Sequence, residues 1–288
     1  MHNAKGVFAV LGGGERQYRT AESLTKAGYV VRGYGLDRYE GLTRAGSLAE
    51  ALKGADFVIL PLPAFDGAGG VSGCVPALEL ETLLEALEPG TLVFGGRLQA
   101  QAAAFEQAAI RAVDYAAMEE MAAANAIPTA EGALRLAMEH LPITLHGSRC
   151  LVIGYGRIGK QLSARLKALG AEVTVAARRA ADRAFIRASD LGSDTTGVYT
   201  KGLEGYDLIV NTVPAMVLDE SQLRQVRKDC FLLDLASSPG GIDREACRRL
   251  GIQAEWALSL PEKSAPATAG AIVRDAVLDY LWTPGGAK

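Results

Sequence analysis

Residues 149–160 read Arg-Cys-Leu-Val-Ile-Gly-Tyr-Gly-Arg-Ile-Gly-Lys, an apolar run that breaks into three spaced glycines. The run predicts a buried parallel strand. The residues after it predict a helix whose apolar face carries Ile158, Leu162, Leu166 and Leu169. A strand, a glycine turn and a helix in this order are typical of a dinucleotide-binding site. The alternative is a glycine-rich structural turn in an α/β sheet.

Each glycine of the turn has a distinct expected role. Gly154 permits a tight turn, Gly156 lets a pyrophosphate approach the backbone, and Gly159 lets the helix pack close to the strand. The open N–H groups of the first helical turn face the phosphates. The expected cofactor contacts in this stretch are Gly154, Tyr155, Gly156, Arg157, Ile158 and Gly159.

The next predicted strand, residues 172–177, ends in two arginines. Arg178 and Arg179 stand about 20 residues past the glycines, where an NAD site would place an acidic residue on the ribose hydroxyls. Two cations at this point suit a 2′-phosphate, so the sequence favours NADP. The alternative is that they are solvated charges opening the next helix, like Arg183 and Arg187.

Composition excludes several classes of protein. The chain has 288 residues, enough for two domains, and 49% hydrophobic residues with 33 glycines, which is typical of a compact α/β protein. A net charge of −3 gives no reason to expect nucleic acid or an anionic membrane as a partner. No metal is expected, because the four scattered cysteines lack metal-binding spacing and instead suggest reduced core thiols of a soluble, unprocessed cytoplasmic protein.

The first half of the chain predicts a second doubly wound unit. Residues 7–11 form an apolar strand followed by Gly12, Gly13 and Gly14, but Gln17 stands where a third glycine would be, so the cofactor fingerprint fails here. Further strands are expected at 29–34, 57–60 and 91–94, and helices at 76–87 and 99–109.

The predicted fold class is therefore α/β, with two doubly wound parallel-sheet (Rossmann-like) domains and an interdomain cleft. Residues 1–124 form a substrate or partner domain, completed by a C-terminal helix at 269–288. Residues 125–268 form the NADP-binding domain.

Candidate substrate ligands lie in the first half. Glycine-rich loops leave N–H groups open, and an adjacent arginine can hold a carboxylate bidentately. This nominates Arg16 with Gly13 and Gly14, and secondly Arg97. The alternative for either arginine is a surface or interdomain ion pair.

Candidate catalytic residues lie between the two halves. Residues 114–126 carry the chain between domains, and Pro128 predicts the start of a helix that runs to about residue 141. Asn125, Thr129 and Glu131 stand at the start of this helix and are expected to face substrate. His140 and His146 are acid/base candidates by type but are expected at the wrong end of the sheet.

Later strand ends add cofactor and substrate contacts. Strands are expected at 206–210, 231–235 and 252–257, in the same parallel sheet as the strand before the nucleotide-binding turn. The turns at their ends are expected to border the cofactor. The alternative is ordinary turn chemistry, which favours the same residue types. The turns nominate Asn211, Thr212, Val213, Pro214, Ala236 and Ser237, the last also for substrate. Lys263 is a further catalytic candidate before a last helix, which is expected to begin after Gly270.

Several motifs together resemble the A-subunit family of dipicolinate synthase over nearly the whole chain. They are Gly12-Gly13-x-x-Arg16-Gln17, Asn125-x-Ile127-Pro128-Thr129-x-Glu131-Gly132, His146-Gly147-Ser148, Asn211-Thr212-x-Pro214, Asp234-Leu235-Ala236-Ser237-x-Pro239-Gly240-Gly241 and Ala265-Pro266-x-Thr268-Ala269-Gly270.

This resemblance implies an oxidoreductase component that dehydrogenates dihydrodipicolinate, or its hydrated precursor, to dipicolinate with NADP. The family draws on a branch of the lysine pathway during endospore formation, and its partner is a flavoprotein-like B subunit. The substrate is a small dicarboxylate, and a homo-oligomer is expected. The resemblance implies carboxylate binding by Arg16. The family carries a lysine where this chain has Ala267, so either Lys263 substitutes for that lysine or the substrate differs. Gly14 also replaces an acidic residue common in the family.

Two other functions remain open at this point. One is a related two-domain dehydrogenase of the 2-hydroxyacid, alanine dehydrogenase or adenosylhomocysteine hydrolase type, which would use a His or Lys as acid/base. The other is a non-catalytic NADP-binding scaffold for the B subunit.

Overall fold

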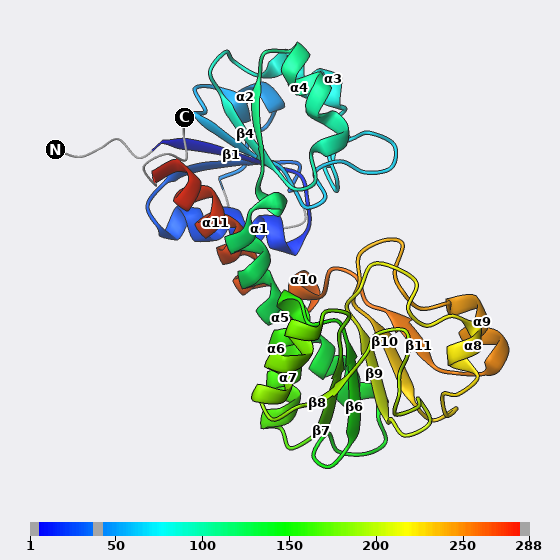
Figure 1. The fold of residues 1–288 in the computed structure, drawn as a ribbon. Coiled ribbons are helices and arrows are strands. Elements are labelled where there is room, and N and C mark those ends of the chain that lie inside the picture. Colours follow the sequence, from blue (N-terminus) through cyan, green and yellow to red (C-terminus); the bar gives the residue numbers. More distant parts are fainter. Residues whose placement is uncertain (1–5, 37–42, 283–288) are drawn as a thin grey trace. The chain divides into compact units, whose positions relative to one another are not determined.

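The computed structural model describes residues 6–36 and 43–282. It divides into two compact units, one of Met1–Asn125 with Ala265–Lys288 and the other of Ala126–Ser264. Each unit is built on one parallel β-sheet covered by helices (Figure 1). The predicted α/β class with two Rossmann-like domains is confirmed.

The sheet of the first unit has the strand order β2-β1-β3-β4-β5. Its strands are β1 (Val7–Leu11), β2 (Val30–Tyr34), β3 (Phe57–Ile59), β4 (Leu92–Gly95) and β5 (Arg111–Asp114). Its helices are α1 (Glu15–Lys26), α2 (Leu48–Leu52), α3 (Leu80–Ala86), η1 (Gln99–Gln101), α4 (Ala102–Gln107), η2 (Tyr115–Ala117) and α11 (Pro266–Trp282).

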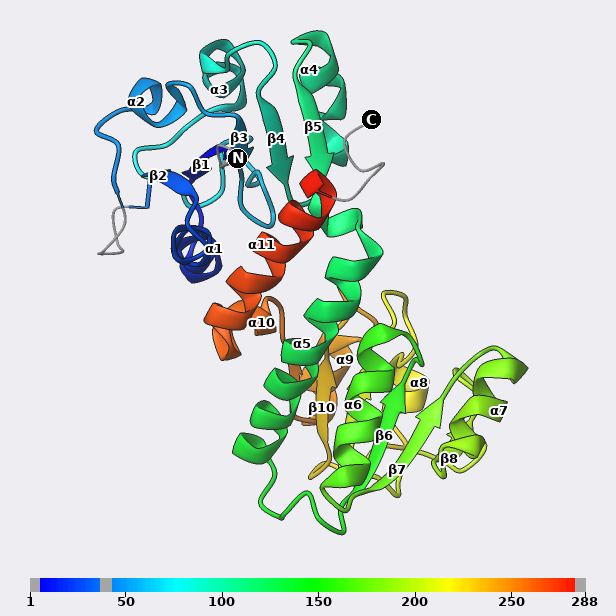
Figure 2. The ribbon, with the colours of Figure 1, turned by 90° about the vertical axis from the view of Figure 1, so that its left-hand side faces the viewer.

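Alternating residues of β1 build the two faces of this core. Phe8 and Val10 pack with residues of α1 and α11, whereas Ala9 and Leu11 pack with residues of α2, α3 and α4. Helices therefore cover both faces, as a fully buried parallel sheet requires (Figure 2). Through α11, the end of the chain completes the unit that the first residues begin.

The sheet of the second unit has the strand order β11-β10-β9-β6-β7-β8. Its strands are β6 (Arg149–Ile153), β7 (Glu172–Ala176), β8 (Gly192–Asp194), β9 (Leu208–Asn211), β10 (Phe231–Asp234) and β11 (Ala254–Trp256). Its helices are α6 (Arg157–Ala168), α7 (Ala180–Ala188), α8 (Glu220–Leu223), α9 (Arg244–Leu250) and α10 (Leu260–Ser264), together with most of α5 (Glu119–His140).

The order of this sheet reverses at β6. The chain runs outward from β6 through β7 and β8, and then returns to pair β9 with the other side of β6. Parallel α/β sheets bind ligands at such a switch point, outside the carboxyl ends of the strands. The glycine turn after β6 lies at that position.

Helix α5 begins earlier than the sequence predicted. Pro128 was expected at the helix start, but it lies inside a helix that begins at Glu119. Proline removes one backbone hydrogen bond from a helix interior. Here the helix is supported on both sides of Pro128, because Met121 packs in one core of the first unit and Ala130 and Leu136 pack in a core of the second.

Other predicted bounds also change. The helix expected at 76–87 is limited to α3, the helix expected after Gly270 begins already at Pro266, and β5 and β8 were not predicted. β5 and β8 are edge strands of four and three residues, too short for a clear pattern.

The four cysteines are buried and unbridged, which confirms the prediction of core thiols. Burial raises the pKa of the Cys150 thiol to about 11 and that of Cys230 to about 12, so both stay protonated near neutral pH.

Among residues 6–36 and 43–282, no helix is both long and apolar enough to cross a lipid bilayer.

Candidate nucleotide-binding site

A pocket of 390 Å³ opens at the carboxyl end of β6. Its wall combines the glycine turn, the end of β7 and the turn after β9. The lining residues are Gly154, Tyr155, Gly156, Arg157, Ile158, Ala177, Arg178, Arg179, Asp182, Thr196, Thr212, Val213 and Pro214.

The glycine turn has room for a ligand only at its middle glycine. A Cβ on Gly154 would meet the Thr212 side chain, and a Cβ on Gly159 would lie 3.0 Å from the Gly154 carbonyl carbon. A Cβ on Gly156 would have no protein atom within 4 Å. Gly154 and Gly159 are therefore needed for packing, whereas Gly156 leaves open space in front of the backbone.

The first turn of α6 presents backbone N–H groups beside that space. Gly156 is the N-cap of α6 and has no side chain to cap these groups, and the first i→i−4 bond runs from the Lys160 N–H to the Gly156 carbonyl. The N–H groups of the first turn lack helical partners by geometry. A helix N-terminus of this kind favours a phosphate. The residues present thus fit a dinucleotide.

Hydrogen bonds fix the turn after β9 against β6. The backbone N–H and the hydroxyl of Thr212 both donate to the Ile153 carbonyl at 2.9 Å. The Val213 N–H donates to the Asn211 side chain at 2.9 Å. This turn is therefore a rigid wall of the pocket.

Asn211 itself is a structural residue in this arrangement. Its side chain is fully buried, and its amide donates to Asp234 at 2.8 Å and to the Val213 carbonyl at 2.9 Å. Asn211, Gly159, Ala236 and Ser237 do not line the pocket, unlike the other predicted cofactor residues. The sheet's own loops use the Asn211 side chain, and its predicted contact with cofactor stays a prediction.

Asp234 holds the neighbouring turn after β10. Its buried carboxylate accepts hydrogen bonds from Asn211 and from the backbone N–H groups of Ala236, Gly241 and Ile242, at 2.7–3.2 Å. One carboxylate thus ties together the turns after β9 and β10. Ser237 lies exposed on the second of these turns.

The charged groups at the end of β7 pair with one another. The Arg179 guanidinium donates two hydrogen bonds of 2.7 Å to Asp182. Hydrogen bonding to Arg179 lowers the pKa of Asp182. Ala177, Asp182 and Thr196 were not predicted as pocket residues, since an alanine, a helix-opening aspartate and a loop threonine carry no signal in the sequence.

The loop that carries Thr196 is held by Asp194. This buried carboxylate accepts from the Thr195 and Thr200 N–H groups and from the Thr200 hydroxyl, at 2.7–3.1 Å. Burial alone would raise the pKa of Asp194, but these hydrogen bonds outweigh it and lower the pKa.

The glycine loop after β1 was expected to have open N–H groups, but two of these groups are hydrogen-bonded. The Gly12 N–H donates to the Tyr34 carbonyl at 2.9 Å and the Gly13 N–H to the Ser72 carbonyl at 2.7 Å. The Gly13 N–H is therefore not open in this structure, whereas the role of Gly13 in substrate binding stays a prediction. Gln17 fills the third-glycine position, and its buried amide donates to the Ile59 carbonyl at 2.7 Å.

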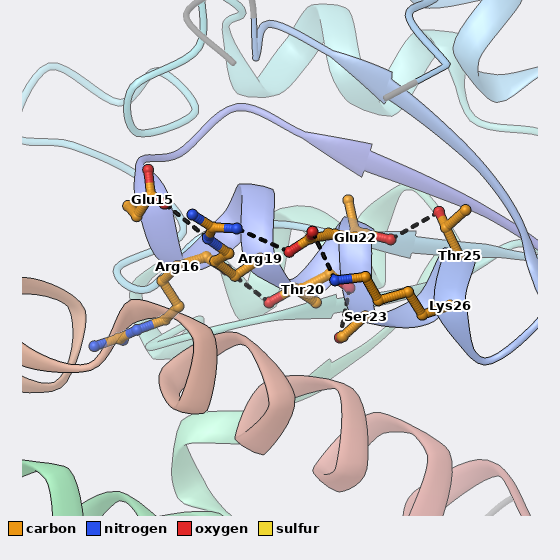
Figure 3. Close-up of polar contacts among 9 residues, drawn as sticks. Glu15, Arg16, Arg19, Thr20, Glu22, Ser23, Thr25 and Lys26 are labelled. Carbon is orange, nitrogen blue, oxygen red and sulfur yellow. Dashed lines mark hydrogen bonds and ion pairs between the residues drawn. The ribbon is translucent and has the colours of Figure 1, made fainter. Parts of the chain in front are cut away.

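Arg16 is 5% exposed, and its side chain extends away from the half-buried ion-pair network of Glu15, Arg19 and Glu22 on the same helix (Figure 3). An arginine this deeply buried differs from an ordinary surface arginine. Arg97, in contrast, is exposed, and Asp114 accepts from the Arg97 N–H at 2.9 Å.

The predicted catalytic residues lie in different surroundings. Thr129 is buried on α5, whereas Glu131 is exposed and 3.7 Å from Arg165 of α6. Lys263 is exposed on α10. Asn125 precedes Thr129 by one helical turn on α5.

Both histidines lie away from the carboxyl end of the second sheet. The His140 ring bonds to the Leu136 carbonyl at 2.9 Å and stacks on Phe231, the first residue of β10. His146 precedes β6 and lies next to Gly170, ahead of β7. This agrees with their predicted location at the other end of the sheet.

Some motif glycines have packing roles. A Cβ on Gly132 would lie 2.7 Å from the Ser264 hydroxyl and 3.1 Å from Leu260, so Gly132 lets α10 pack on α5. A Cβ on Gly270 would lie 2.6 Å from the backbone of Arg19 and Thr20, so Gly270 lets α11 pack on α1. Part of the motif pattern is thus explained by helix contacts.

Comparisons with known proteins identify the family. Residues 7–116 match the family model for the N-terminal domain of the dipicolinate synthase A subunit. The chain is 32% identical to the A subunit of dipicolinate synthase from Bacillus subtilis strain 168 over 282 residues, 95% of each chain. The chain belongs to the dipicolinate synthase A-subunit family.

Solved structures of the dipicolinate synthase A subunit have the same fold. The structure from Bacillus halodurans matches with a TM-score of 0.87 and 28% identity, covering 99% of this chain and 100% of that chain. The structure from Bacillus subtilis matches with a TM-score of 0.85 and 31% identity, covering 98% and 97%.

A second family model describes the pocket-bearing unit of this dipicolinate synthase homologue. Residues 115–245 match the NAD-binding domain of D-isomer specific 2-hydroxyacid dehydrogenases. The chain is therefore an oxidoreductase of the dehydrogenase type with a nicotinamide cofactor.

Proposed function

We propose that this chain dehydrogenates a dihydrodipicolinate-type ring, or its hydrated precursor, to dipicolinate with NADP. The observation that carries the proposal is the pocket after β6, where an open glycine turn stands beside Arg178 in a member of this family. In an endospore-forming cell, the reaction would belong to the branch that leaves lysine synthesis.

The nicotinamide, when bound, accepts a hydride from the substrate. The dihydropyridine ring also loses one proton, so that dihydrodipicolinate and NADP⁺ become dipicolinate, NADPH and H⁺. The hydrated precursor must lose water as well. Because the product ring is aromatic, the step does not require a strong general base, consistent with histidines that lie at the other end of the sheet.

Within the first unit, Arg16 is the proposed ligand of a substrate carboxylate. Its guanidinium can bind a carboxylate bidentately, and its burial strengthens such a contact. Gly14, Arg97 and Ser237 remain proposed secondary contacts. The N–H of Gly13 is already bonded, so its contribution is to shape the loop.

The proton from the ring goes to a group on α5 in this proposal. Asn125 and Thr129 are four residues apart and share one face of the helix, where they can hold a water molecule. Glu131 is the other candidate, although its carboxylate lies near Arg165. Lys263 on α10 is proposed as a further contact that compensates for Ala267.

The partner in this proposal is a flavoprotein-like B subunit. The relatives are named as A subunits, which supports a second component in the working enzyme. Homo-oligomerisation of the present chain is part of the same proposal.

The cofactor assignment predicts a specific effect of Arg178. Replacing Arg178 by glutamine should raise the dissociation constant of NADP about 10- to 30-fold, because a charge-assisted contact to the 2′-phosphate is lost. The NAD dissociation constant should change less than about twofold. Calorimetric titration of both cofactors measures this; tighter binding of NAD than NADP by the wild-type protein would contradict the assignment.

The second family match also brings a 2-hydroxyacid dehydrogenase reaction into consideration. Substitution of the histidines distinguishes the two reactions, because that alternative would use a histidine or lysine as acid/base. A lost acid/base group costs about 100-fold or more in turnover. Substituting His140 or His146 by glutamine should lower kcat by less than about threefold, well below that scale. Steady-state rates at saturating cofactor test this, with melting temperatures as the control for folding.

A further inference from the structure

The end of β7 carries three arginines and one carboxylate within six residues, and their contacts are unequal. Arg183 donates to the backbone carbonyls of Ala177 and Arg178, at 2.9 and 2.5 Å. Arg179 is held by Asp182 through two hydrogen bonds of 2.7 Å. Among the residues that the structure describes, the Arg178 side chain has no hydrogen-bond or ion-pair partner.

We propose that Asp182 is a specificity-determining residue that restrains Arg179, so that Arg178 alone contacts the 2′-phosphate of NADP. This inference rests on the proposed NADP function and gives each of the three arginines a different role. Arg183 positions the backbone that carries Arg178, and Arg178 binds the phosphate. Asp182 keeps Arg179 from binding the phosphate.

The surfaces of the pocket support this division. Arg178 lines both the pocket after β6 and an adjoining pocket of 250 Å³, and Thr196 and Val213 also line both. Arg178 therefore stands where the two spaces meet.

Asp182 has a second effect through its charge. It lies in the first turn of α7 and lines the same pocket as Arg178, so its carboxylate repels an incoming phosphate dianion. Its side chain is 18% exposed, whereas that of Arg179 is 78% exposed. Asp182 thus limits preference for NADP both by holding a cation and by adding a negative charge.

Neutralising Asp182 tests the inference. In Asp182→Asn, the amide keeps the size of the side chain but releases Arg179. We expect the NADP dissociation constant to fall roughly three- to fivefold, the scale of one exposed charge interaction, with NAD affinity changed less than about twofold. Calorimetric titration with NADP and NAD, repeated with 2′,5′-ADP and 5′-ADP as adenosine halves, measures binding without turnover.

A double-mutant cycle identifies the source of the gain. Arg179→Gln in the wild-type background should change NADP affinity less than about twofold. In Asp182→Asn it should remove the part of the gain that comes from the released Arg179 and leave the part that comes from the lost negative charge. Arg178→Gln is the matched loss control. Urea denaturation of each variant separates a binding effect from a folding effect.

The outcomes separate the two proposals. If wild-type protein binds NAD as tightly as NADP and Arg178→Gln changes neither, the NADP assignment fails, and the role of Asp182 fails with it. If NADP is preferred but Asp182→Asn leaves its affinity unchanged or lowers it, only the restraint by Asp182 is overturned. An effect of Arg179→Gln equal to that of Arg178→Gln would also overturn it.

Discussion

Alanine at position 156 is expected to weaken NADP binding roughly 30- to 150-fold, the equivalent of about 2–3 kcal/mol for lost contacts to a charged group. The expected cause is steric, because the new methyl group occupies the space through which the pyrophosphate approaches the N–H groups of α6. Calorimetric titration with NADP measures the effect.

Protein stability should hardly respond to the same change. Gly156 has φ −81° and ψ −163°, which alanine adopts without strain, and its Cβ would meet no protein atom within 4 Å. Urea denaturation should show a change below about 1 kcal/mol. Gly67→Ala is the matched control, because that site is also open but lies in the first unit. NADP affinity within threefold of wild type would contradict a pyrophosphate at this turn.

Gly159→Ala should behave in the opposite way. Its Cβ would press on the carbonyl of Gly154, so the helix must move away from the strand and stability must fall. The three glycines of one motif therefore separate into two packing positions and one ligand-facing position.

Replacing Asp234 by alanine is expected to destabilise the second unit by about 3–5 kcal/mol, the cost of breaking a buried charged network. Its carboxylate accepts from one side chain and three backbone N–H groups, which would be left buried without this acceptor. Asp234→Asn should lose less, since one carbonyl oxygen remains. Chemical denaturation followed by circular dichroism measures both.

Asp229→Ala provides the control for Asp234. Asp229 is 72% exposed and pairs only with Arg227 in the described residues, so its loss should cost less than about 1 kcal/mol. Equal destabilisation by the two alanine variants would show that the Asp234 network does not hold the turns after β9 and β10.

The nucleotide pocket was largely predictable because its chemistry is local in sequence. A buried strand, three spaced glycines and a helix are contiguous, and the arginines follow one strand later. Two of the three glycines, the first residues of the helix and both arginines line one pocket. Helix α5 was mispredicted because Pro128 is a strong local start signal, whereas the packing of Met121 that extends the helix backwards is a tertiary effect.

Features that depend on distant partners could not be predicted. The N–H of Gly13 is bonded to Ser72, which lies some sixty residues away and carries no sequence signal for that pairing. The pairing of Asp182 with Arg179 spans only three residues, and it was not predicted because an acidic residue in the first turn of a helix is ordinary. The residue types of the site could be predicted from the sequence, but the hydrogen bonds and ion pairs that these residues form could not.

The proposed reaction moves a hydride from a dihydropyridine dicarboxylate to NADP⁺. The most direct measurement supplies a freshly generated dihydrodipicolinate-type substrate and NADP⁺, with and without the B subunit, and follows NADPH by absorbance and dipicolinate by chromatography. The predicted result is equimolar NADPH and dipicolinate in a reaction that requires this chain. NADP binding with no NADPH formed under either condition would contradict the claim and leave this chain a nucleotide-binding scaffold.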